Sequence, residues 1–176
     1  MRRRSSGQSV VEMAFVLPVL VLVLFGIVDF GYYIYGYATI YQAARNGAEK
    51  ASQIPPYETK VDPKLVSNET CVRNILETIQ GQATLFPNLT ANDGQLDNRI
   101  QIDYPTDTDG PTGRELGAPV EVKITYNIQP LTPLWRFVTL GTRGTMQVRA
   151  VSRRSIESLG LNPNTNYAPN LIACQQ

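Results

Sequence analysis

The sequence VVEMAFVLPVLVLVLFGIVDF occupies residues 10–30 and decides the architecture of the chain. It contains no charged residue between Glu12 and Asp29. With the valines before it and the aromatic residues after it, the apolar stretch reaches about 20 residues, which is the length that a helix needs to cross a bilayer. The sequence therefore predicts one membrane-spanning helix near the N-terminus.

The flanks of this stretch predict its orientation. Three arginines, Arg2 to Arg4, precede it, and an aromatic cluster follows it, made of Phe30, Tyr32, Tyr33, Tyr35, Tyr37 and Tyr41. Basic residues stay on the cytoplasmic side, whereas tyrosines favour the membrane interface. We therefore expect a single-pass protein of the cytoplasmic membrane, with its N-terminus inside and its C-terminal domain extracytoplasmic.

Glu12 at the head of the helix calls for a compensating charge. A carboxylate at bilayer depth costs about 2.5–3.5 kcal/mol of insertion energy, which a simple anchor has no reason to carry. A protease that cut between Gly7 and Gln8 would create an α-amine on Gln8 and leave Glu12 as the fifth residue of the shortened chain. We predict that Glu12 pairs with such an amine on a neighbouring subunit.

Pro18 lies inside the predicted helix. Its ring nitrogen cannot donate a hydrogen bond to the carbonyl of Ala14, so we predict a kink or local unwinding there. Such a proline is either tolerated within the membrane or gives a flexible point that lets the helix leave the bilayer for a filament. Both interpretations stay open at this point.

Two other fates of the N-terminus compete with the cut after Gly7. The triplet Gly36-Tyr37-Ala38 fits the small-x-small rule of secretory signal peptides, and cleavage there would make Thr39 the first residue. The apolar stretch is too long for a signal peptide, and Asp29 precedes that site. A permanently uncleaved signal anchor is the stronger alternative.

Beyond the membrane stretch the helical pattern continues to Ser52 and stops at Ile54-Pro55-Pro56, since the residue before a proline disfavours helix. Small residues recur there at helical spacing and form a stripe of Ala43, Ala44, Gly47, Ala48 and Ala51. Such a stripe permits close approach, either to the chain's own sheet or to a neighbouring helix.

The remainder of the chain predicts an α+β domain. An amphipathic helix over 68–79, capped by Ser67 or Asn68, places Val72, Ile75, Leu76 and Ile79 on one face. Residues 99–104, 120–126 and 145–152 alternate polar with apolar and predict an antiparallel sheet. The apolar segment 131–137 would cover the end of the domain or touch lipid. We divide the chain into 1–7 leader, 8–52 helix, 53–66 linker, 67–156 domain and 157–176 irregular tail.

Composition narrows the function classes. The 176 residues have a formal net charge of +1 and no histidine, so neither nucleic-acid binding nor catalysis by the commonest general base is indicated. Asp107-Thr108-Asp109-Gly110 hints at a calcium loop, but its spacing places Pro105 and Leu116 where ligands belong. We expect no catalytic residue, no metal site and no cofactor.

The two cysteines, Cys71 and Cys174, fall on the side that we assign as extracytoplasmic, where disulfides persist. A bridge would close a loop of about a hundred residues; two free thiols are the alternative. Asn68 and Asn88 begin glycosylation patterns, which need a suitable host. The charged residues Arg149, Arg153, Arg154 and Glu157 predict either a solvated strand edge or a contact surface for another subunit.

Four motifs in this order resemble a TadE-like minor pseudopilin of the tight-adherence (Tad) type IV pilus: Gly7-Gln8-Ser9-Val10-Val11-Glu12, Leu17-Pro18, Phe25-Gly26-Ile27-Val28-Asp29-Phe30-Gly31 and Ala43-Ala44-Arg45-Asn46-Gly47-Ala48. The resemblance covers the first fifty residues, with Met13 where such proteins often have an aromatic residue. It implies a subunit that helps assemble or prime the pilus after a prepilin peptidase has cut between Gly7 and Gln8. The implied partners are that peptidase, a major pilin, a companion pseudopilin, an inner-membrane assembly platform and membrane lipid. The competing hypothesis is an unprocessed, membrane-anchored extracytoplasmic binding domain.

Overall fold

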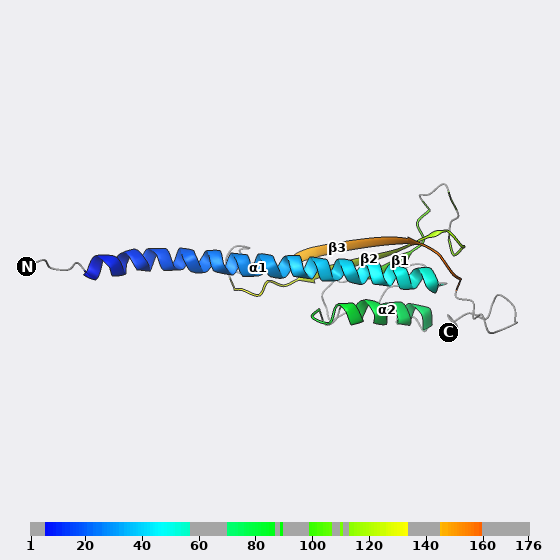
Figure 1. Cartoon of the computed structure of the whole chain (residues 1–176), viewed down its shortest axis with the longest axis horizontal. Helices are drawn as coiled ribbons and strands as arrows, with labels where there is room; N and C mark the ends of the chain where they lie inside the picture. Colours follow the sequence, from blue (N-terminus) through cyan, green and yellow to red (C-terminus); the bar gives the residue numbers. More distant parts are fainter. Residues whose placement is uncertain are drawn as a thin grey trace, which may run out of the picture. The chain divides into compact units, whose positions relative to one another are not determined.

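A computed structural model describes residues 6–56, 70–86, 89, 99–106, 110, 113–133 and 145–159 (Figure 1). The elements follow the order α1 (Ser6–Gln53), α2 (Thr70–Gln82), β1 (Arg99–Asp103), β2 (Pro119–Ile128) and β3 (Met146–Ser155). The predicted α+β class is confirmed: a long N-terminal helix precedes a small domain with one short helix and a three-stranded antiparallel sheet.

Helix α1 continues for 48 residues. The N–H of Ile54 still donates to the carbonyl of Lys50, at 3.1 Å, but the helix itself ends at Gln53, two residues before Pro55 and Pro56. Prolines supply no N–H with which to continue the helical ladder, so the predicted stop is found one residue from the expected place. Helix α2 covers residues 70–79 of the predicted helix 68–79 and continues to Gln82. Residues 67–69, which include the predicted caps Ser67 and Asn68, lie outside the described residues.

The sheet has the order β1-β2-β3, with β2 in the centre. β1 pairs antiparallel with β2, placing Ile100 opposite Ile124 and Ile102 opposite Val122. These four side chains are fully buried, as are Val120 and, nearly so, Val148 and Ala150. Because side chains alternate across a strand, all of them lie on one face, the inner face of the sheet.

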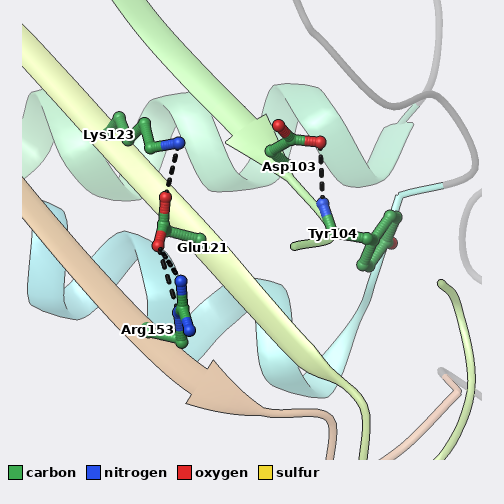
Figure 2. Close-up of polar contacts among 5 residues, drawn as sticks. All are labelled: Asp103, Tyr104, Glu121, Lys123 and Arg153. Carbon is green, nitrogen blue, oxygen red and sulfur yellow. Dashed lines mark hydrogen bonds and ion pairs between the residues drawn. The ribbon is translucent and has the colours of Figure 1, made fainter. Parts of the chain in front are cut away.

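Helix α2 and the second half of α1 lie on this inner face (Figure 2). The predicted face of α2 is buried at Val72, Ile75 and Ile79, while Leu76 is half-buried at its margin. The small-residue stripe of α1 is buried throughout, with Ala43, Ala44, Ala48 and Ala51 fully inaccessible to solvent. Of the two packing partners that the sequence left open for this stripe, the structure selects the chain's own domain.

Gly47 shows why the stripe needs small residues. A Cβ atom added at this position would lie 2.7 Å from both Cγ1 and Cδ1 of Ile79 and 3.5 Å from Cγ1 of Val122. The first two distances are shorter than van der Waals contact allows. The absence of a side chain at Gly47 therefore lets α1 approach α2 and β2 at the same point.

The outer face of the sheet carries charged side chains. Glu121 on β2 lies between Lys123, whose Nζ is 2.6 Å from Oε1, and Arg153 of β3, whose Nη2 is 2.9 Å from Oε2 (Figure 2). The side chain of Glu121 is only 7% exposed. Burial by itself raises the pKa of this carboxyl, but the hydrogen bonds and positive charges of Lys123 and Arg153 outweigh it, so the pKa lies below its ordinary value.

Hydrogen bonds fasten the end of α1 to the rest of the domain. Arg114 donates from Nε to the carbonyl of Pro55, at 2.8 Å, and from Nη2 to the carbonyl of Leu159, at 3.0 Å. The hydroxyl of Tyr104 donates to the carbonyl of Pro56, and the N–H of Glu157 donates to that of Ser52. The Ser52 carbonyl, which the helix end leaves without an intrahelical partner, is thus used in a tertiary contact, as are the carbonyls of Pro55 and Pro56 just beyond the helix.

The chain forms two compact units, residues 1–35 with 128–146 and residues 36–127 with 147–176. The second half of α1 therefore belongs to the unit that holds the sheet, whereas its first half belongs to the other. The division at residues 53–66 drawn from the sequence stays a prediction, and residues 57–69 and 160–176 lie outside the described part of the chain.

Candidate functional site

The first half of α1 presents its apolar side chains outward. From Val10 to Val28 every residue is exposed except Val21, which is half-exposed. The most apolar part of the helix has a mean hydropathy of 2.7, and none of this part is buried. The helix is therefore long and apolar enough to cross a membrane. Such an exposed apolar surface needs an apolar environment, so this half of α1 is a membrane anchor.

The predicted cleavage site lies in the first turn of this helix. α1 begins at Ser6, so Gly7 and Gln8 are both helical, and Gly7 is exposed, with open space where a side chain would stand. Glu12 follows little more than one turn later and is also exposed. The structure thus places the three residues on one continuous helix, at the N-terminal end of the apolar surface.

Pro18 lies inside α1, and the helix is continuous from Ser6 to Gln53 across it. The local unwinding that the sequence allowed is absent from this described segment. The kink and its use as a flexible point stay predictions.

Asp29 is a residue whose role the sequence reasoning missed. It follows the uncharged stretch directly, yet it is only 5% exposed. Its Oδ1 accepts hydrogen bonds from the backbone N–H groups of Leu131 and Thr132, both at 3.0 Å, and its Oδ2 accepts one from the Thr132 hydroxyl. We call these contacts the Asp29 clamp. They offset the cost of burying the carboxylate.

The sequence held one signal of the clamp, namely an acidic residue at the end of an apolar run. The partners could not be found in the same way, because they come from a segment more than a hundred positions further along the chain. Donors that belong to the backbone leave no trace in residue type. Of the predicted apolar segment 131–137, residues 131–133 are described, and Leu131 and Thr132 take part in the clamp. Residues 134–137 lie outside the described part of the chain.

The other predicted sites have mixed outcomes. Cys71 is fully buried in α2 and is disulfide-bonded, while Cys174 lies outside the described residues. The residues Asn68, Asn88, Asp107 and Asp109 also lie outside the described residues. Within the described ranges, no group of three or more acidic or cysteine side chains is placed to hold a metal ion.

Comparison with known protein families gives a match in the N-terminal helix. The family model described as TadE-like protein matches residues 7–49, which include Gly7, Glu12, Pro18, Asp29 and most of the small-residue stripe. Neither the curated proteins nor the solved structures gave a significant match. The matched segment is the anchor of the chain together with the part of α1 that packs on the sheet. Residues 7–49 of this chain are therefore similar to TadE-like proteins.

Proposed function

We propose that the chain is a minor pseudopilin that helps assemble or prime a Tad/Flp-type type IV pilus after a prepilin peptidase has cut between Gly7 and Gln8. One observation carries this proposal: an exposed glutamate stands five positions beyond an exposed glycine, at the head of an exposed apolar helix within a TadE-like segment. An anchor alone explains the apolar surface. It does not explain a carboxylate placed at the start of that surface.

The proposed mechanism is packing of helices rather than catalysis. After the cut, Gln8 carries a positive α-amine, and the carboxylate of Glu12 on one subunit neutralises the amine of a neighbouring subunit. Charges of opposite sign attract strongly where water is excluded, so this pair would favour one axial position of the incoming helix. The partners are the prepilin peptidase, a major pilin, a companion pseudopilin and the inner-membrane assembly platform.

The disulfide state of Cys71 supports the proposed orientation. Disulfide bonds persist in oxidising compartments and are rare in the cytosol. Cys71 lies in α2, in the domain that follows the anchor, and it is disulfide-bonded. This favours a domain outside the cytoplasm and an N-terminus inside, as the three leading arginines also indicate.

Substitution of Glu12 tests the mechanism. We expect Glu12→Leu to enter the membrane at least as well as the native chain, because it removes a costly charge, and to abolish the recovery of surface pili. Glu12→Asp, which keeps the charge, is expected to retain part of the assembly. The measurements are carbonate extraction of membranes, for insertion, and immunoblotting of the major pilin in sheared surface fractions.

Glu49→Gln is the matched control, because Glu49 is another exposed carboxylate on α1, distant from the cleavage site. It should leave both insertion and pilus recovery unchanged. Normal pili from Glu12→Leu would contradict the proposal and favour an unprocessed anchor that carries an extracytoplasmic binding domain.

A further inference from the structure

We propose that Leu131 makes a second, shallow contact with the outer lipid surface of the membrane, and that the Asp29 clamp holds it at that depth. The inference rests on α1 crossing the membrane and is independent of any role in a pilus. It concerns one compact unit of the chain, which contains both Asp29 and the segment 128–146.

The position of Asp29 along α1 gives its depth. Glu12 and Asp29 bound the uncharged part of the helix, and their 17-residue separation corresponds to about 26 Å at 1.5 Å per residue. The hydrocarbon core of a bilayer is about 30 Å thick. A helix with Glu12 near one boundary of that core therefore brings Asp29 close to the other boundary.

The clamp carries this depth over to the segment after β2. The donors belong to two adjacent residues: Leu131 and Thr132 each donate a backbone N–H, and Thr132 also donates its hydroxyl. The backbone at these residues is therefore hydrogen-bonded directly to the Asp29 carboxylate. The carboxylate is nearly buried by this contact. The Asp29 carboxylate thus has hydrogen-bond donors inside the chain.

The side chain of Leu131 is directed away from the protein. It is 62% exposed although it is a large apolar residue, and Pro133 two positions later is also exposed. On α1, the residues that flank Asp29 are exposed and apolar as well: Ile27 at 64% and Phe30 at 65%. At this depth the surface of the helix meets lipid, so lipid is the occupant that the position of Leu131 favours.

Depth-dependent fluorescence quenching tests the proposal. The single tryptophan, Trp135, is replaced by phenylalanine, and a tryptophan is introduced at position 131 in the full-length chain. The protein is reconstituted into phosphatidylcholine–phosphatidylglycerol vesicles that contain lipids brominated near the glycerol end of the acyl chains. We expect Leu131→Trp to show blue-shifted emission that these lipids quench.

Two reference positions calibrate the measurement. Leu116→Trp replaces a leucine of similar exposure, 58%. Leu116 precedes β2, whereas Leu131 follows it. The tryptophan at position 116 should emit as indole in water does, without quenching. Phe25→Trp lies one turn before Asp29 and should be quenched by more deeply brominated lipids. Loss of quenching at position 25 would show that α1 does not cross the bilayer and would remove the premise.

Variants of the clamp test its part in the proposal. In the Leu131→Trp chain, Asp29→Ala should remove most of the quenching, and Thr132→Val, which removes only the hydroxyl donor, should remove less. Glu49→Ala, an exposed carboxylate on the same helix, should change nothing. Thr132→Val keeps the test valid if Asp29→Ala does not fold.

Three results would overturn the proposal. Emission at position 131 that matches position 116 would place Leu131 in water. Blue-shifted emission that brominated lipid does not quench would place it against protein. Unchanged quenching in both Asp29→Ala and Thr132→Val would show that the clamp does not set the depth.

Discussion

At the scale of single residues, Gly47 shows how closely the helix half next to the sheet is packed. Gly47→Ala brings a Cβ to 2.7 Å from two atoms of the fully buried Ile79. Overpacking of a core costs about 1–3 kcal/mol, while alanine gains about 1 kcal/mol over glycine in a helix. We therefore expect a net loss of about 1 kcal/mol in the free energy of unfolding, measured by urea denaturation of the full chain in detergent micelles.

Gly81→Ala is the control for this substitution. Gly81 lies in α2, is exposed and has open space where a Cβ would stand, so alanine there should be neutral or stabilising. Ile79→Val, which removes the Cδ1 atom of the clash, should lessen the effect of Gly47→Ala. Equal effects of alanine at positions 47 and 81 would show that the contact is not tight.

Glu121 gives the fold a dependence on pH. Its pKa is lowered in the folded protein, so its ion pairs stabilise the fold above the ordinary pKa of a glutamate, about 4.3, and this stabilisation is lost as the pH falls through the lower folded pKa. Glu121→Gln should lower the free energy of unfolding at pH 7 by about 1 kcal/mol, since both cationic partners remain partly hydrated. The difference from the native chain should shrink in acid.

Urea denaturation near pH 7 and again well below the ordinary glutamate pKa measures both effects. Glu115→Gln replaces an exposed glutamate in the turn before β2 and should change neither value. A Glu121→Gln chain whose deficit is the same in acid as at neutral pH would show that the charge of Glu121 is not what stabilises this face of the sheet.

At the scale of elements, the sequence predicted the ones whose pattern is local. The proline pair ends α1, and the alternation in 120–126 identifies β2. The strand extends further, to Ile128, because Asn127 lies on the outer face of the sheet, where a polar side chain fits the alternation. The packing of the small-residue stripe could not be assigned from the sequence, since small residues suit contacts within and between chains equally. The Asp29 clamp depends on distant backbone donors and was missed for that reason.

The bond of Cys71 belongs to this scale, because it ties α2 to another part of the chain. With two cysteines in the sequence, we propose Cys174 as the partner. Thiol labelling of the denatured protein should modify neither cysteine before reduction and both after it. Cys174→Ser is expected to destabilise the domain by up to about 4–5 kcal/mol in the chain-entropy model. Labelling of both thiols in protein taken from membranes without reduction would refute the pairing.

At the scale of the whole molecule, α1 has two functions along its length. Its first half is an exposed apolar anchor, and its second half supplies part of the core of the α+β domain. Helix α1 is continuous from Ser6 to Gln53 and contributes residues to both compact units. This arrangement suits a subunit that enters a helical bundle while it carries a domain at the periphery.

The mature N-terminus tests the central claim most directly. Mass spectrometry of the protein from native membranes and from sheared surface fractions, with allowance for cyclisation of Gln8, identifies the first residue of the chain. We predict a start at Gln8. This result would show cleavage after Gly7, which creates the α-amine that we propose to pair with the Glu12 of a neighbouring subunit. A start at Met1 or Arg2 would contradict processing and leave an anchored domain, and a start at Thr39 would mean a secreted domain without the assembly helix.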